Sequence, residues 1–225
     1  MQSLRWHLFT DPAALEQAAA EAILRAGREA AARAGVFHLV LAGGTTPRRV
    51  YERLRRAEAD WARWRVYFGD ERCLPPDHPE RNSRMAHAAW LEGVPVPSAQ
   101  VHVIPAEDGP VPAAAAYTRT LAGVGEFDLV VLGLGEDGHT ASLFPGRTWG
   151  DAAALPVENA PKPPPQRVSL SPARLSAARQ VLFLVSGAGK AEAVAAWRAG
   201  REIPACRITP ASGVDVFLDR AASGP

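Results

Sequence analysis

Residues 127–132 read Phe-Asp-Leu-Val-Val-Leu, and residues 133–146 continue as Gly-Leu-Gly-Glu-Asp-Gly-His-Thr-Ala-Ser-Leu-Phe-Pro-Gly. The apolar run has the length and composition of a buried strand. The glycines after it let the backbone bend sharply and approach a ligand closely. His139 lies in this loop, and imidazole is well suited to move a proton near neutral pH. A strand that leads into such a loop is typical of the ligand site of an open α/β sheet. A glycine-rich turn with an exposed histidine would fit the same residues.

The composition favours a globular protein with a local site. The chain has 225 residues, a formal net charge of +1 and 47% hydrophobic residues. So small a net charge favours neither nucleic acid nor a membrane surface as a partner. Two cysteines fit a reducing compartment, and no apolar run approaches the ~20 residues that span a bilayer. The first ten residues lack the apolar centre of a signal peptide. We therefore expect a cytoplasmic protein; its oligomeric state stays open.

Strand and helix patterns alternate along the chain. Strands without polar alternation favour a mainly parallel sheet that is covered on both faces. We expect one α/β domain over residues 1–225, an open, doubly wound, Rossmann-like sheet with helices on both faces, with or without a small lid. The proline-rich residues 161–165 predict an extended surface loop. The predicted strands are 37–42, 65–69, 101–104, 127–133, 167–170, 180–186 and 214–218; the predicted helices are 12–35, 46–54, 82–91, 112–122 and 189–199.

A second strand end, residues 41–47, reads Leu-Ala-Gly-Gly-Thr-Thr-Pro. The helix that follows would present unpaired N–H groups and a partial positive charge, which attract phosphate. Gly43 and Gly44 remove side chains from that surface, and Thr45 adds a hydroxyl. The pattern is neither a Walker loop nor a complete dinucleotide fingerprint, so the sequence predicts neither ATP nor NAD.

A third strand end, residues 68–75, reads Phe-Gly-Asp-Glu-Arg-Cys-Leu-Pro. Arg72 could clamp a phosphate through its fork of donors. Asp70 could bind sugar hydroxyls or orient a histidine. A solvated charge cluster at the start of a loop is the alternative, and it is the usual one for an isolated Asp-Glu-Arg. Asn82 would cap the next helix.

Further charged residues lie near the predicted site. Asp137 could hold the tautomer of His139 or cap its turn. Lys190 begins a helix after Ser-Gly-Ala-Gly, and this suggests phosphate binding in a chain whose only other lysine is Lys162. Arg167 could reach a ligand from the side. No His or Cys pair has metal-ligand spacing, so we expect no metal.

Five segments occur in the order found in 6-phosphogluconolactonases, and the chain resembles that family. They are residues 41–47, residues 69–72 with 82–83, residues 127–146, residues 167–170 and residues 187–191. The resemblance implies hydrolysis of 6-phospho-D-glucono-1,5-lactone to 6-phosphogluconate, the second step of the oxidative pentose phosphate pathway, without metal or cofactor. It implies that His139 activates water, with Asp137 and Asp70 as the acidic site residues. The implied substrate- and phosphate-binding residues are Gly43, Gly44, Thr45, Arg72, Arg167 and Lys190.

Two other functions fit parts of the pattern. Amino-sugar phosphate deaminase-isomerases share the superfamily fold. Those that resemble this chain carry a glutamate five residues after the histidine. Phe144 stands at that position here, and this favours lactone hydrolysis. A sugar-phosphate sensor would need a DNA- or partner-binding module, yet the sequence shows no helix-turn-helix and no basic face.

Overall fold

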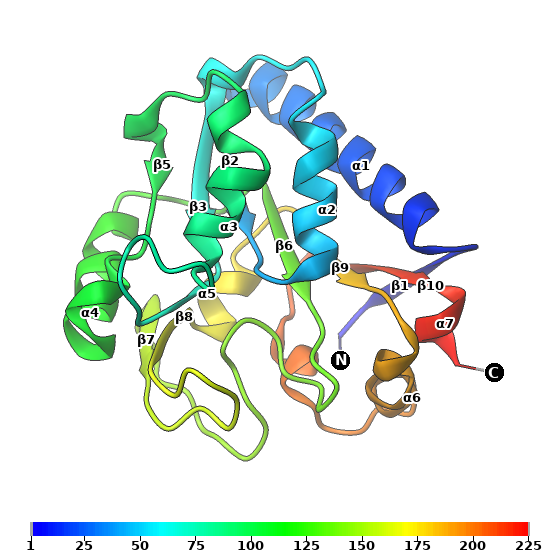
Figure 1. Cartoon of the computed structure of the whole chain (residues 1–225). Helices are drawn as coiled ribbons and strands as arrows, with labels where there is room; N and C mark the ends of the chain where they lie inside the picture. The colour runs from blue at the N-terminus through cyan, green and yellow to red at the C-terminus, as the bar shows by residue number, and fades with distance from the viewer. Residues whose placement is uncertain (1, 225) are drawn as a thin grey trace.

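A seven-stranded sheet forms the centre of the computed structural model, which describes residues 2–224 (Figure 1). The strand order is β1-β10-β9-β6-β2-β3-β5, and every neighbouring pair is parallel. This confirms the mainly parallel sheet that the apolar strands predict. The strands are β1 (Leu4–Phe9), β2 (Phe37–Leu41), β3 (Trp64–Phe68), β5 (Val101–His102), β6 (Leu129–Gly133), β9 (Val181–Val185) and β10 (Val214–Asp219).

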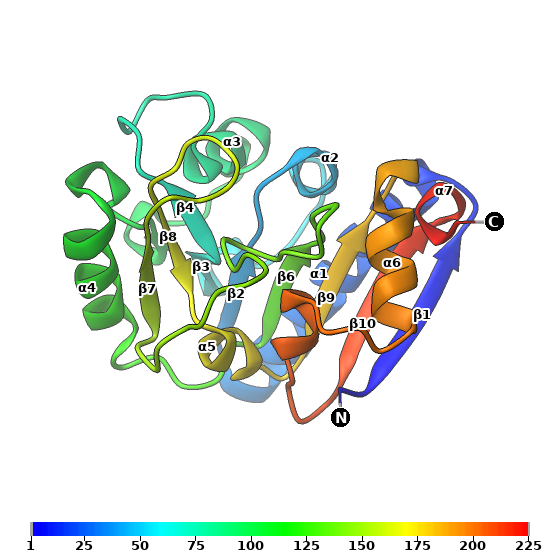
Figure 2. The same ribbon diagram turned by 90° about the horizontal axis from the view of Figure 1, so that it is seen from below.

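Helices cover both faces of this sheet (Figure 2). On one face lies α1 (Pro12–Ala34), which begins where Asp11 accepts a hydrogen bond from an amide of the first turn and ends at Gly35, with φ of +75°. On the other face lies α6 (Ala191–Arg198), whose Trp197 packs edge-on against Phe183 of β9. The doubly wound arrangement is therefore confirmed. The other helices are α2 (Thr45–Leu54), α3 (Asn82–Ala89), α4 (Pro110–Leu121), α5 (Pro172–Ser176) and α7 (Arg220–Ser223).

A second, antiparallel sheet of three strands was not predicted. It consists of β4 (Asp70–Arg72), β8 (Arg167–Leu170) and β7 (Ala154–Val157), in the order β4-β8-β7. β4 has three charged residues and β7 contains a proline, so neither shows a strand pattern. β8 was expected as a strand, and it pairs here rather than in the main sheet. Its register sets Arg167 opposite Arg72.

The order of the strands creates a crevice in the main sheet. From β2 the chain proceeds outward through β3 and β5, whereas β6, β9 and β10 build the sheet in the opposite direction. Since β2 and β6 are neighbours, the loops after them leave in different directions. Ligands of open α/β sheets bind at such a switch point, beyond the carboxyl ends of the strands. No helix within residues 2–224 is both long and apolar enough to cross a bilayer.

Candidate active site

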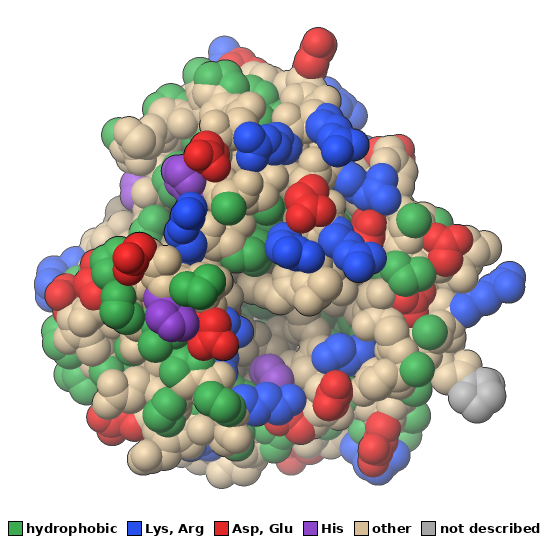
Figure 3. Space-filling view, in the orientation of Figure 1, with side chains coloured by type: hydrophobic (Ala, Val, Ile, Leu, Met, Phe, Trp, Pro, Cys, Tyr) green, Lys and Arg blue, Asp and Glu red, His purple; other side chains and the backbone are tan. Residues whose placement is uncertain are grey.

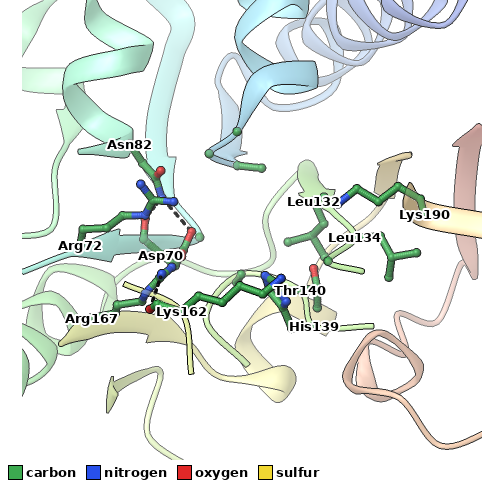
Figure 4. Close-up of a pocket in the computed structure, with 17 residues that line it drawn as sticks. Asp70, Arg72, Asn82, Leu132, Leu134, His139, Thr140, Lys162, Arg167 and Lys190 are labelled. Carbon is green, nitrogen blue, oxygen red and sulfur yellow. Dashed lines mark hydrogen bonds between the residues drawn. The ribbon is translucent and has the colours of Figure 1, made fainter. Parts of the chain in front are cut away.

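A cleft of about 200 Å³ opens at this switch point. On the face shown in Figure 3, basic side chains and a histidine gather around a hollow. Loops after β2, β3, β6 and β9 contribute to the cleft, so segments far apart in the sequence meet there (Figure 4). Seven of the predicted site residues line it: Gly43, Gly44, Asp70, Arg72, His139, Arg167 and Lys190.

Two predicted site residues do not line the cleft. Thr45 is the exposed first residue of α2. Asp137 lines a neighbouring hollow and reaches the cleft only through His139. Three polar residues line the cleft without having been predicted as site residues: Asn82, Thr140 and Lys162.

His139 and Asp137 form a hydrogen-bonded pair. Oδ1 of Asp137 contacts Nδ1 of the imidazole and also accepts the backbone N–H of His139 at 3.1 Å. Asp137 thus both caps the turn and orients the ring. Because a carboxylate only accepts hydrogen bonds, the proton of a neutral imidazole lies on Nδ1 and leaves Nε2 as a base. A Cβ on Gly135 would lie 2.0 Å from Nδ1, so this pair requires glycine there.

The surroundings keep the imidazole neutral and the carboxylate ionised. The His139 side chain is 18% exposed. Burial lowers the pKa of His139 below its usual 6.5, and it outweighs the opposing effect of Asp137. Burial alone would raise the pKa of Asp137, but hydrogen bonds from His139 lower it below 3.8. At neutral pH the site therefore offers an oriented, uncharged base.

Asp70 is held rigidly on the side of the cleft that bears Arg72 and Arg167 (Figure 4). Its carboxylate accepts a hydrogen bond from Ser142 Oγ at 2.7 Å and another from Asn82 Nδ2 at 2.9 Å. Asn82 lies so close to Gly43 that a Cβ there would be 1.9 Å from Asn82 Oδ1. Asp70 is 6% exposed, so two fixed donors replace water that its carboxylate would otherwise bind.

The Asp-Glu-Arg segment is not a solvated charge cluster. Glu71 is fully buried and accepts hydrogen bonds from the backbone amides of Asn82 and Ser83 at 2.7 and 2.8 Å. Its carboxylate also pairs with the buried Arg81. A carboxylate at a helix N-terminus satisfies free amides and matches the helix dipole. Glu71 therefore caps α3, a role that the sequence suggested for Asn82.

Arg167 is largely occupied by protein groups. Its Nε donates to the carbonyl oxygen of Pro164 at 3.0 Å, and its Nη2 donates to those of Lys162 and Pro163. The guanidinium thereby holds the proline loop, residues 161–165, beside the cleft. Arg72 donates through Nη1 to the carbonyl oxygen of Glu80. Both arginines line the cleft; Arg167 is engaged at two of its nitrogens, whereas the buried Nε of Arg72 has no partner within residues 2–224.

Sequence reasoning did not predict that Lys162 lies in the cleft. Lys162 was assigned to a surface loop, because the proline-rich composition describes a conformation but gives no position. Its rarity was the one available signal, since the chain has only two lysines.

Residues 2–224 contain no group of three His, Cys, Asp or Glu side chains arranged for a metal ion; a metal-free reaction stays a prediction.

The cleft and its fold match known proteins. Residues 10–217 match the family model described as glucosamine-6-phosphate isomerases/6-phosphogluconolactonase. The chain belongs to this family. It is 38% identical to the 6-phosphogluconolactonase of Synechocystis, with 86% of each chain covered. A crystal structure of 6-phosphogluconolactonase from Thermotoga maritima superposes on 96% of the chain, with a TM-score of 0.90 and 26% identity.

The family description names two activities, and a protein with the deaminase activity has the same fold. A monomeric glucosamine-6-phosphate deaminase covers 97% of the chain with a TM-score of 0.87 and 21% identity. At that identity the similarity shows the fold alone. The choice between the chemistries within the family therefore depends on the residues of the cleft.

Proposed function

We propose that the chain hydrolyses 6-phospho-D-glucono-1,5-lactone to 6-phosphogluconate, as the second step of the oxidative pentose phosphate pathway in the cytoplasm. The observation that carries the proposal is an oriented, neutral imidazole that opens into the same cleft as cationic side chains. The lactone needs a base near its carbonyl carbon and cations near its phosphate. The relative named 6-phosphogluconolactonase supports this choice of substrate.

His139 begins the reaction in this proposal. Its Nε2 takes a proton from a water molecule, and the water oxygen attacks the lactone carbonyl carbon to form a tetrahedral oxyanion. We propose that backbone N–H groups of residues 133–140 and the buried Thr140 hydroxyl, which has no partner within residues 2–224, donate to that charge. The imidazolium then protonates the ring oxygen as the C–O bond breaks, and the carboxylic acid ionises. Asp137 stabilises the imidazolium while it exists.

Two effects supply the rate. A placed general base typically contributes about 10²–10⁴-fold. Holding the phosphate fixes the lactone against the imidazole, and such positioning is worth several kcal/mol more. The proposed phosphate contacts are the glycines of residues 43–44, the hydroxyl of Thr45, Arg72 and Lys190. Arg167 supports them from the side through the proline loop that it holds. Asp70 would accept hydrogen bonds from sugar hydroxyls.

Phe144, five residues after His139, favours hydrolysis over deamination. Phe144 is buried, and its ring centroid lies 4.8 Å from that of His139. An apolar ring therefore occupies the place where the deaminase-isomerases resembling this chain carry a glutamate. A sensor would need to bind the sugar phosphate, but it would not need the His139–Asp137 pair.

The test compares the wild type with His139→Ala. We expect the wild type to hydrolyse the lactone well above its spontaneous opening and to release little ammonia from glucosamine 6-phosphate. His139→Ala should lose at least about 10²-fold in kcat while 6-phosphogluconate still binds. A variant that hydrolyses the lactone at the wild-type rate would refute the mechanism. Ammonia release from glucosamine 6-phosphate at a rate comparable to lactone hydrolysis would show that the chain is a deaminase instead.

A further inference from the structure

The two lysines of the chain lie in one place. Among 25 lysine and arginine residues, only Lys162 and Lys190 are lysine, and both line the cleft. Everywhere else the chain uses arginine for positive charge. Lysine carries a compact ammonium with three freely directed donors, whereas arginine carries a planar fork. The cleft thus holds both lysines of the chain together with Arg72 and Arg167.

Different parts of the fold deliver the two ammonium groups. Lys162 comes from the proline loop that Arg167 holds, and Lys190 directly precedes α6. Figure 4 shows the two side chains entering the cleft from different sides. Burial lowers the pKa of Lys190; Glu136 opposes this shift, and the charge of Lys162 adds to it. Lys162 has the same effect on the neighbouring His139.

Neither ammonium is neutralised by direct contact. Within residues 2–224, Lys162 and Lys190 form no side-chain ion pair and no side-chain hydrogen bond. Glu136 and Asp137 act on Lys190 only at longer range. Two half-buried like charges that face each other repel, and an anion between them relieves that repulsion. A phosphate dianion matches this pair in charge.

The other groups that line the cleft also favour phosphate at the end that holds Lys190. Gly43 and Gly44 also line it, at the start of α2, where free amides favour an anion. At the opposite end, Arg167 is engaged by carbonyl groups and Asp70 adds negative charge. That end suits sugar hydroxyls better than a dianion, and Arg72, which also lies there, would reach the phosphate only from its side.

We propose that Lys162 is a phosphate-binding residue, which forms with Lys190 a two-lysine clamp on the phosphomonoester of the substrate. Arg167 is a positioning residue that acts through the loop bearing Lys162. The identity of the phosphomonoester depends on the proposed function, but the clamp itself should bind inorganic phosphate. The two proposals can therefore fail separately.

Binding of inorganic phosphate tests the clamp directly. Protein labelled with ¹³C-lysine gives side-chain signals from two residues only, and Lys162→Met assigns them. We expect phosphate to shift both sets of signals with one common saturation curve. In Lys162→Met, phosphate affinity should fall about tenfold or more, because a charge-assisted contact is lost. The control Arg25→Met removes an equal charge from an exposed position of α1 and should change nothing.

Kinetics with the lactone separate the possible roles. The clamp predicts that Lys162→Met raises KM about tenfold or more while kcat stays within about threefold. Lys162→Arg should recover part of the loss. Arg167→Met should raise KM as well, and the double variant should be little worse than either single one, because both act through the same ammonium.

Three results would overturn the clamp. The first is a Lys162 signal that does not shift on addition of phosphate. The second is an unchanged phosphate affinity in Lys162→Met, and the third is a fall in kcat at constant KM in that variant. The last would assign Lys162 to the carbonyl end of the substrate. A wild type without lactonase activity would refute the proposed function and would leave the phosphate titration as a valid test of the clamp.

Discussion

At the scale of single residues, the site depends on close approaches that only glycine permits. Gly135 lets Asp137 meet the imidazole of His139, and Gly43 lets Asn82 reach Asp70. The sequence motif shows these glycines but does not say which atoms approach them. The structure supplies the partners, and they are the groups that orient the base and the second carboxylate.

Asp137→Asn should change both the rate and its pH dependence. Because neutral His139 is the base, the wild-type rate should fall on the acid side with a midpoint below 6.5. Asp137 raises the pKa of His139, so the variant should shift this acid limb to still lower pH. Its kcat should drop at least about tenfold, because the tautomer is no longer fixed. Profiles of kcat against pH, corrected for spontaneous opening, provide the measurement, with the exposed Asp151→Asn as control. A shift to higher pH would contradict the assignment.

Gly43→Ala should disturb the Asp70 end of the cleft. The new Cβ would lie 1.9 Å from Asn82 Oδ1, so the asparagine must move and Asp70 loses a donor. We expect a loss of about 1–3 kcal/mol in unfolding free energy together with reduced turnover. Gly123→Ala is the matched control, because its Cβ would meet nothing within 4 Å. Equal effects of the two substitutions on urea unfolding would speak against this reading.

At the scale of elements, helix α3 is fixed by a buried carboxylate rather than by its own first residue. Glu71 lies on β4, so its hydrogen bonds to Asn82 and Ser83 join the second sheet to the start of the helix. That junction also positions Asn82 against Asp70. The charged segment that looked like a surface cluster is therefore part of the scaffold of the cleft.

Glu71→Gln should destabilise the protein far more than Glu107→Gln. Both carboxylates pair with Arg81, but Glu71 is fully buried and the Glu107 side chain is 39% exposed. Removing one partner of a buried pair costs roughly 3 kcal/mol or more, whereas an exposed partner is worth about 1 kcal/mol or less. Urea unfolding of the two variants measures the difference. Comparable midpoints would show that Glu71 is not the main support of α3.

Sequence reasoning succeeded where an element carries its own signal. β2, β6 and β9 are short apolar runs, and α1 has a clear start at Asp11 and a clear end at Gly35. It failed for β4, whose three residues are all charged, and for β7, which contains a proline. It also missed Lys162, because the position of its loop is fixed by hydrogen bonds from Arg167 to backbone carbonyl groups. Every residue has such a carbonyl group, so the sequence does not show which of them are bound.

At the scale of the whole molecule, the strand order brings the site together. The loops after β2 and β6 diverge at the switch point, and the ends of β3 and β9 lie on either side. Residues from 43 to 190 consequently share one cleft. The family membership agrees with this arrangement, and the cleft residues select the chemistry within it.

The stability of the protein should fall in mild acid. Burial lowers the pKa of His38, His102 and His139 below 6.5 in the folded state. Below pH 6.5 the unfolded chain therefore binds more protons than the folded one, and unfolding becomes easier as the pH falls towards the folded-state pKa values. The lowered pKa of Asp137 and Asp215 acts only further down, near and below 3.8. Calorimetry at pH 8, 7, 6 and 5.5 should show a Tm that is flat at first and then falls. A constant Tm down to pH 5.5 would contradict this.

A crystal structure with bound 6-phosphogluconate tests the central claim most directly. The account predicts the ligand in the cleft at the switch point, with its carboxylate within about 2.6–3.2 Å of His139 Nε2 and its phosphate at the end of the cleft that holds Lys190. A phosphate bound beside Asp70, with the carboxylate turned away from His139, would contradict it.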